Sequence, residues 1–150
     1  MSDAFRQVED WAAALLERFS PSERKRLAMD LARALRRSQS ARIGDQLAPD
    51  GSPYPARKRR LRDKKGRIKR QKMFSRLRTA RYLKATATAD AAEVGFEGRT
   101  GRIATVHQYG DMDKVSPDGP RVRYPRRPLI GFTDGDRRAI RDQLIDRLAK

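Results

Sequence analysis

The stretch from Arg57 to Lys84 carries almost all of the net charge of this chain. It holds fifteen Lys or Arg residues against one acid, Asp63, a net charge of +14 out of +17 for the whole chain. Residues 1–48 and 85–150 are nearly balanced between bases and acids. Like charges at this density repel one another. The block must therefore lie in solvent, or against a polyanion or a set of carboxylates.

The composition indicates a single domain with a thin core. The chain has 150 residues, of which 37% are apolar and 37% charged, so we expect packed segments at both ends and a poorly packed middle. The absence of cysteine excludes disulfides and thiolate ligands, and one histidine does not make a structural zinc site. No cofactor or metal is therefore expected. Without a long apolar run or a signal peptide, we expect a soluble protein made in the cytoplasm, with no membrane contact.

Two helices are predicted at the N-terminus. Apolar residues at three- and four-residue spacing, among them Trp11 and Phe19, predict an amphipathic helix over 3–19. Ser20, Pro21 and Glu23 are typical of a helix start with a capping box, and this second helix is predicted to reach Gln46. Because almost no loop separates the two helices, we expect a helical hairpin over 3–46, with Trp11 and Phe19 in the core.

The middle of the chain changes character twice. Residues 48–55 contain three prolines and one glycine, which exclude a helix and favour turns. Residues 57–72 contain eleven bases and only two apolar side chains, so they are predicted to form an arm that becomes ordered only against a partner. Met73, Phe74 and Leu77 mark the return to packed structure.

Short strands and a short helix are predicted next. Residues 82–88 and 92–96 have the composition of two strands joined as a hairpin. Residues 102–110 fit a helix that ends at Gly110 as a left-handed cap, with Ile103, Val106 and Tyr109 pointing to one side. The polar stretch 111–119 is predicted to be a loop.

The last part of the chain is predicted to be an edge strand and a helix. Two prolines limit 121–128 to an edge strand at best. Thr133 is a helix cap, and the following helix has an apolar stripe made of Ile140, Leu144, Ile145 and Leu148. The predicted fold class is α+β, with an N-terminal helical hairpin, a small antiparallel sheet, a long basic insertion arm and a C-terminal helix. One domain covers 1–150, with the arm at 55–72 and an α+β core at 73–150.

Catalytic constellations are lacking. A single histidine, His107, would have to serve any triad, and its place on an amphipathic helix favours a hydrogen-bonded structural role. Asp111, Asp113 and Asp118 lack the spacing of a calcium loop and are interpreted as solvated loop acids. GRTGR at 98–102 lacks the end of a phosphate-binding loop. We therefore expect no enzyme activity and no catalytic residues.

Four motifs in the same order resemble one family. They are IGDQLAPDGSPYPARKRRLRDKKGRIKR, MFSRLRTARYLKA, VHQYG and RYPRRPLIGFTD. Together they resemble the phage virion morphogenesis (tail completion) proteins of contractile-tailed temperate phages, over about residues 40–135. The resemblance implies a non-enzymatic virion component that acts late in tail assembly, at the head-proximal end of the tail.

The resemblance also implies partners. Related tail-completion and terminator proteins are small α+β subunits that form rings, commonly sixfold, so the expected partners are other copies of this chain in a hexameric ring, the end of the tail tube and sheath, and the head connector. Double-stranded DNA passes through such a neck. The expected location is the tail or neck of the virion, and the host cytoplasm during assembly. The motif positions expected to matter structurally are Gln46, Pro49, Gly51, Pro53, Tyr54, His107, Tyr109, Gly110, Arg127, Pro128 and Gly131.

The arm is the segment richest in binding chemistry. Lysines and arginines bind phosphates and carboxylates as point charges or bidentate forks, with an affinity that falls steeply in salt. Few aromatic residues lie nearby, which argues against recognition of single strands by stacking. A second hypothesis remains open, a basic nucleic-acid-binding module of ribosomal or packaging-associated type. The candidate contact residues are Arg57, Lys58, Arg59, Arg60, Arg62, Lys64, Lys65, Arg67, Lys69, Arg70 and Lys72.

Overall fold

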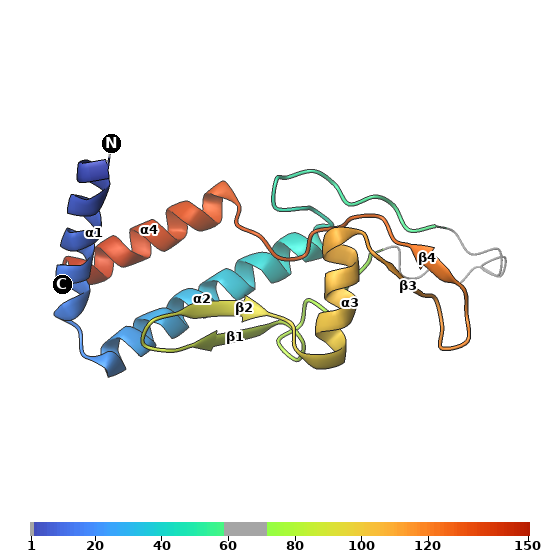
Figure 1. Cartoon of the computed structure of the whole chain (residues 1–150), viewed down its shortest axis with the longest axis horizontal. Coiled ribbons are helices and arrows are strands. Elements are labelled where there is room, and N and C mark those ends of the chain that lie inside the picture. The colour runs from blue at the N-terminus through green and yellow to red at the C-terminus, as the bar shows by residue number, and fades with distance from the viewer. Residues whose placement is uncertain (1, 59–71) are drawn as a thin grey trace.

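The computed structural model describes residues 2–58 and 72–150, and its fold is α+β as predicted (Figure 1). Most of the predicted basic arm, 59–71, lies outside the described residues. In chain order the elements are α1 (Ser2–Glu17), α2 (Pro21–Gly44), β1 (Lys84–Ala87), β2 (Ala92–Gly95), α3 (Gly98–Tyr109), β3 (Met112–Lys114), β4 (Arg121–Arg123) and α4 (Asp134–Leu148).

The start of α2 follows the predicted local chemistry. The backbone N–H of Glu23 donates to the Ser20 hydroxyl at 3.2 Å, and the backbone N–H of Ser20 donates to the Glu23 carboxylate at 2.8 Å. Pro21 occupies the first helical turn, where its missing N–H costs nothing. Thr133 and Asp136 form a second capping box at the start of α4. Both predicted helix starts are confirmed.

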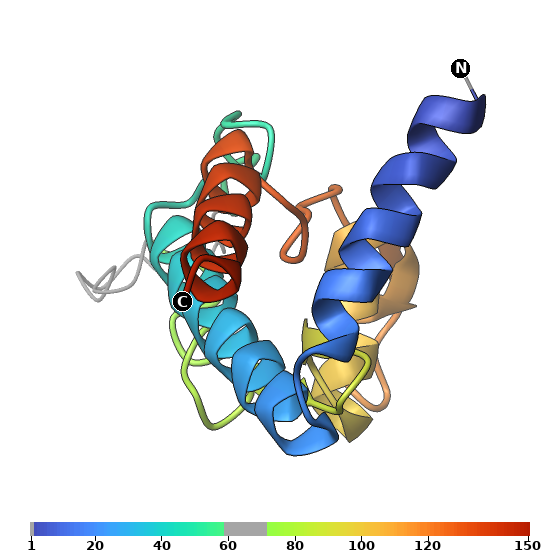
Figure 2. The same ribbon diagram turned by 90° about the vertical axis from the view of Figure 1, so that its left-hand side faces the viewer.

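The long helix α2 is the axis of the molecule. The antiparallel hairpin β1–β2 packs along one side of it, and α4 lies against another side (Figures 1 and 2). Arg147 of α4 donates to the Asp30 carboxylate of α2 at 2.6 Å, and the Ser38 hydroxyl of α2 donates to Asp136 of α4. These two contacts hold α4 beside α2.

The strands form two separate two-stranded sheets. β1 pairs with β2, with Ala85 opposite Val94, as the sequence predicts. β4 pairs with β3, with Val122 opposite Asp113. The second pairing corrects the prediction for 111–119, because β3 lies within the stretch expected to be a polar loop. A three-residue strand of mostly polar residues has no alternation long enough to be recognised in the sequence.

The core lies at the C-terminal end of α2, in the middle of the chain. A cluster of buried side chains joins α2, the 48–54 turn, α3 and the segment before α4, and partly buried apolar residues pack around it. The buried members are Ile43, Ala48, Tyr54, Ala104 and Leu129, and the surrounding ones are Met73, Phe74, Leu77, Phe96 and Ile130. This arrangement corrects the expectation of packed ends and a poorly packed middle, because residues beyond the basic arm return to complete the core.

Helix α1 does not fold back along α2. The helix and the short connection form as predicted, but α1 extends away from the body of the molecule (Figures 1 and 2). Trp11 is 64% exposed and Leu16 is 39% exposed, whereas Phe19 is half-buried. The predicted hairpin packing and the core position of Trp11 are therefore wrong for the single chain. The periodicity shows that one face of α1 is apolar, but not what covers it.

Two other predicted apolar stripes are only partly correct. Gly110 ends α3 with φ 69°, as predicted for a left-handed cap, but α3 begins earlier, at Gly98. Val106 is buried, whereas Ile103 is 40% and Tyr109 67% exposed. In α4, Leu144 is half-buried, but Ile145 is 55% exposed. No helix in the described part of the chain is long and apolar enough to cross a membrane.

Candidate functional site at the ends of the basic segment

The basic segment, residues 57–72, begins and ends on the core. Arg57, Lys58 and Lys72 are described and exposed. The other predicted contact residues, Arg59, Arg60, Arg62, Lys64, Lys65, Arg67, Lys69 and Arg70, lie outside the described residues. The site is therefore built from the residues that hold the two ends of this segment.

Gln46 fixes the end at which the segment returns to the core. Its side-chain amide donates to the carbonyl of Ile43 at 2.7 Å and to the carbonyl of Met73 at 2.9 Å. Its side-chain oxygen accepts the backbone N–H of Met73 at 2.7 Å. Gln46 has φ 61°, a left-handed conformation that is uncommon outside glycine. This backbone bend follows α2 directly and accompanies the contact with Met73.

Arg127 fixes the other end. Its guanidinium donates from Nε to the carbonyl of Pro55 at 2.8 Å and from Nη2 to the carbonyl of Ala56 at 3.0 Å. The side chain is buried, and burial lowers the pKa of Arg127 below its ordinary value. Its backbone N–H donates to the carbonyl of His107 at 2.7 Å. The planar fork of an arginine thus holds two successive carbonyls just before the basic segment, an arrangement that lysine cannot reproduce.

Arg42 and Tyr54 join the two ends through the core. The buried Arg42 donates to the carbonyl of Leu47 at 2.8 Å and to the carbonyl of Leu129 at 2.6 Å. The Tyr54 hydroxyl donates to the carbonyl of Pro128 at 2.8 Å and accepts a longer hydrogen bond, 3.4 Å, from Arg42. Burial raises the pKa of Tyr54, and the neighbouring Arg42 charge opposes that shift.

Gln108 of α3 holds the same C-terminal segment from the other side. Its side-chain oxygen accepts the backbone N–H groups of Leu129 at 2.8 Å and of Ile130 at 2.9 Å. Its side-chain NH₂ donates to the carbonyl of Ile130 at 2.8 Å. The side chain of Gln108 therefore makes the backbone hydrogen bonds that a neighbouring strand would otherwise make to Leu129 and Ile130. Gln46 does the same for Met73.

His107 is packed between aromatic rings. Its ring lies edge-on to Phe74 at 4.9 Å and to Tyr124 at 5.2 Å between centroids, and Phe74 in turn lies edge-on to Tyr54. Nδ1 of His107 is buried and has no hydrogen-bond partner among the described residues. Burial first, and the charge of Arg127 second, lower the pKa of His107. The structural role predicted for His107 comes from ring packing, not from a hydrogen bond of that nitrogen.

Two glycines permit close approaches in this region. A Cβ on Gly131 would lie 2.5 Å from Cγ of Pro49, and a Cβ on Gly110 would lie 3.1 Å from the backbone nitrogen of Arg126. Gly51 instead has φ 86° in the turn that brings Pro53 opposite Leu47.

Most of the motif positions chosen from the sequence therefore gather in one region, between the end of α2, the end of α3 and the 127–131 segment. Three of these positions are exposed, namely Gly51, Pro53 and Tyr109. Sequence reasoning missed Arg42 and Gln108. Arg42 could have been noticed because it lies next to Ile43 on the buried face of α2, near the C-terminal end of that helix. Gln108 offers no such signal, because its partners are backbone groups of a distant segment.

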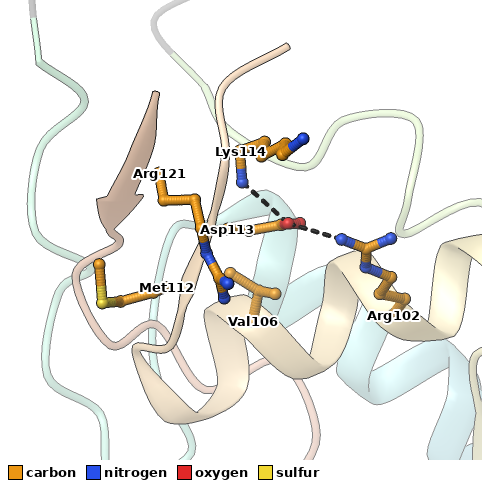
Figure 3. Close-up of a pocket in the computed structure, with 6 residues that line it drawn as sticks. All are labelled: Arg102, Val106, Met112, Asp113, Lys114 and Arg121. Carbon is orange, nitrogen blue, oxygen red and sulfur yellow. Dashed lines mark hydrogen bonds and ion pairs between the residues drawn. The ribbon is translucent and has the colours of Figure 1, made fainter. Parts of the chain in front are cut away.

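A separate cavity of about 280 Å³ lies beside α3 (Figure 3). Its walls come from α3, β3 and β4, and its lining residues are Arg102, Val106, Met112, Asp113, Lys114 and Arg121. The Asp113 carboxylate accepts the Lys114 backbone N–H at 2.9 Å and Arg102 Nη2 at 2.7 Å, and both interactions lower the pKa of Asp113. Asp113 is therefore not the solvated loop acid that the sequence suggested.

The arrangement around the core orients backbone and presents positive charge. Gln46, Gln108 and Arg127 are engaged with backbone carbonyl or N–H groups. Within residues 2–58 and 72–150, no three His, Cys, Asp or Glu side chains cluster as they would around a metal ion. The described side chains of this site thus fix the backbone on both sides of the basic segment.

Comparison with known proteins decides the family. Residues 3–149 match the model of the phage virion morphogenesis family. The chain belongs to this family. It is 42% identical over 148 residues to the tail completion protein S of Escherichia phage P2, a match that covers 97% of this chain and 98% of that protein. No solved structure matches significantly. The family resemblance inferred from the four motifs is confirmed, and with it a role in the morphogenesis of phage virions.

Proposed function

We propose that this chain is a tail completion subunit, a structural protein that assembles into a ring at the head-proximal end of the phage tail and makes the tail competent for joining to the head. Support comes from its likeness, over nearly the full length of both chains, to a protein named for tail completion. The subunit acts in the neck of the virion, after synthesis in the host cytoplasm. Its partners are other copies of itself, the end of the tail tube and the head connector.

The role that we propose for the basic segment is supported by the way in which its two flanks are held. The half-buried Gln46 and the buried Arg127 hold the residues that flank the segment. Burying an arginine such as Arg127 costs desolvation energy, which is offset here by two charge-assisted hydrogen bonds to the chain just before the segment. A fold that places its buried polar groups in this way is suited to present the segment in a fixed position.

We infer that the basic segment contacts a polyanion in the assembled neck, either the phosphates of passing double-stranded DNA or carboxylates of a tail protein. The eleven Lys and Arg side chains among these sixteen residues favour contact with the phosphate backbone of a nucleic acid over contact with its nucleobases. Direct readout of sequence would need ordered contacts with base edges in a groove. Such contacts weaken steeply as salt rises.

Charge reversal tests this function in a phage that depends on the chain. In one variant Arg59, Arg60, Lys64 and Lys65 are replaced by Glu, which changes the charge of the segment by eight units. We expect the variant to fold, and electron microscopy of lysates to show full heads and finished tails that do not join. Normal virion yield from a folded variant would refute the role of the segment.

A matched control reverses four exposed bases of α2 instead, Lys25, Arg26, Arg33 and Arg37. The overall change in charge is the same, so a general effect of net charge would impair both variants equally. We expect virions to form with the control. Circular dichroism of both purified variants separates a loss of joining from a loss of folding.

The oligomeric state separates the structural function from a nucleic-acid-binding module. At about 0.5 M salt, surface electrostatics is screened within a few ångströms. We expect the purified chain, free of nucleic acid, to form rings visible by negative-stain microscopy under these conditions. A monomer that assembles only when DNA or RNA is added would favour the binding module instead.

A further inference from the structure

Helix α1 has exposed apolar side chains that the rest of the described chain leaves uncovered. Trp11 is 64% exposed and Leu16 39% exposed, with Leu15 half-buried beside them. Figure 1 shows α1 at one end of the molecule, and Figure 2 shows that it diverges from α2 and stands apart from α4. A single exposed apolar residue is ordinary, but a large aromatic and a leucine on one face of an unpacked helix indicate a contact surface.

The charge of α1 narrows the choice of partner. Four acids, Asp3, Glu9, Asp10 and Glu17, stand against one base, Arg6, so α1 carries −3. With +17 for the whole chain, the remaining residues carry +20. Counted in the same way, α2 carries +5, α3 +2 and α4 zero. Two copies of α1 would repel one another, whereas the net positive charges of α2 and α3 attract it.

The cavity beside α3 is complementary to α1 in both charge and polarity. Arg102, Lys114 and Arg121 surround it, and with Asp113 they give it a net charge of +2 (Figure 3). Val106 and Met112 contribute its apolar wall. Two exposed apolar side chains of α3 extend the surface outside the cavity, Ile103 at 40% and Tyr109 at 67% exposed. This patch suits an apolar side chain flanked by acids, which is how Trp11 is presented after Glu9 and Asp10.

Within one chain the two surfaces cannot meet. α1 lies at one end of the molecule and the β3–β4 hairpin at the other, with the length of α2 between them (Figure 1). A helix of 24 residues is about 36 Å long. The complementary surface that α1 can reach is therefore on a second copy.

We propose that α1 of one subunit docks on the α3–β3–β4 surface of the next, with Trp11 at the cavity lined by Arg102, Met112 and Arg121. The contact uses different surfaces on the two subunits, so it is heterologous and can continue from copy to copy until a ring closes. The proposal rests on the ring assembly proposed above and assigns the surfaces that make it.

Complementary variants test this interface. Trp11→Ala removes the inserted side chain and leaves the cavity intact, whereas Arg121→Glu reverses charge at the cavity and leaves α1 intact. Both residues are exposed, so both variants should fold. We expect each alone to associate at least about thirtyfold more weakly than the native chain, as for a central aromatic or arginine of an interface. Analytical ultracentrifugation measures the midpoint concentration of assembly.

The mixture of the two variants is the decisive sample. Each has one functional surface, so an equimolar mixture should give a one-to-one dimer and no larger species. A mixture that remains monomeric, or single variants that assemble as the native chain does, would overturn the proposal. Ile145→Ala and Arg138→Glu on α4 are the matched controls, exposed residues of the same two types outside both surfaces, and should assemble normally.

Trp11, the single tryptophan of the chain, gives an independent signal. Its fluorescence should shift to shorter wavelength as the native chain assembles, and Arg121→Glu should suppress that shift. Native rings that form without any change in Trp11 emission would refute the docking of α1 while leaving ring assembly intact. A native chain that stays monomeric at about 100 µM, well above the concentrations at which stable interfaces form, would refute both.

Discussion

Two substitutions of Gln46 separate the stabilising effect of its side-chain hydrogen bonds from the destabilising effect of its left-handed backbone conformation. Gln46→Ala removes three hydrogen bonds, one to the carbonyl of Ile43 and two to the backbone of Met73. Each is worth about 1 kcal/mol net, because the freed groups partly regain water. Alanine keeps the strained positive φ of 61°. We therefore expect Gln46→Ala to lower the free energy of unfolding by about 3 kcal/mol.

Gln46→Gly loses the same hydrogen bonds but removes the strain. A left-handed conformation costs a non-glycine residue about 1–2 kcal/mol, while glycine adds about 0.5–1 kcal/mol of chain entropy to the unfolded state. The glycine variant should therefore be destabilised by only about 2 kcal/mol. The expected order of stability is native, then glycine, then alanine, with about 1 kcal/mol between the variants.

Urea unfolding followed by circular dichroism gives both free energies, and limited trypsin digestion reports the local effect. Lys72 immediately precedes Met73, so loss of the two Met73 hydrogen bonds should speed cleavage after Lys72 in both variants. Gln7→Ala, at an exposed position of α1, is the control and should change neither quantity. An alanine variant as stable as the native chain, or one equal to the glycine variant, would refute the reasoning.

Three further changes test other parts of the core. Gln108→Met leaves three backbone groups of the 129–130 segment without partners and should cost about 2–4 kcal/mol in urea unfolding; no loss would mean that water replaces the amide. Gly131→Ala forces a Cβ to within 2.5 Å of Pro49 and should lower the free energy of unfolding by about 1–3 kcal/mol. The control Gly135→Ala, in α4, has room for the Cβ and should raise the free energy of unfolding by about 0.5–1 kcal/mol in the same assay. Equal effects of the two substitutions would refute the packing argument. Because the pKa of His107 is lowered in the folded chain, the neutral ring contributes fully to stability above about pH 6.5. This contribution is lost as the pH falls below that value and through the pKa of the folded state. The urea midpoint of the native chain should therefore fall between about pH 7.5 and 5, and that of His107→Gln should change less.

Local chemistry was predictable from the sequence because it depends on neighbours in the chain. The capping box of Ser20 and Glu23, the left-handed cap at Gly110 and the cap at Thr133 all form where the sequence places them. The hairpin β1–β2 was also predictable, because two short strands with a tight turn pair with each other first.

Contacts between distant segments were not predictable in the same way. The periodicity of α1 identifies an apolar face but leaves open whether the same chain or another covers it, so Trp11 was assigned to the core in error. Arg42 and Gln108 are polar residues whose partners are backbone carbonyls and N–H groups far along the chain, and a pattern that separates polar from apolar assigns both to the surface. The four motifs identified Gln46 and Arg127 as structurally important positions, but the sequence did not predict that the two lie in one region.

The hydrogen bonds of Gln46 and Arg127 hold backbone groups at the two margins of the basic segment, at Met73 on one side and at Pro55 and Ala56 on the other. Because the partners are backbone groups outside the segment, these contacts do not depend on which side chains the segment carries. In this sense the side chains of the basic segment are replaceable without loss of those hydrogen bonds. A change of charge within the segment therefore leaves these four hydrogen bonds in place.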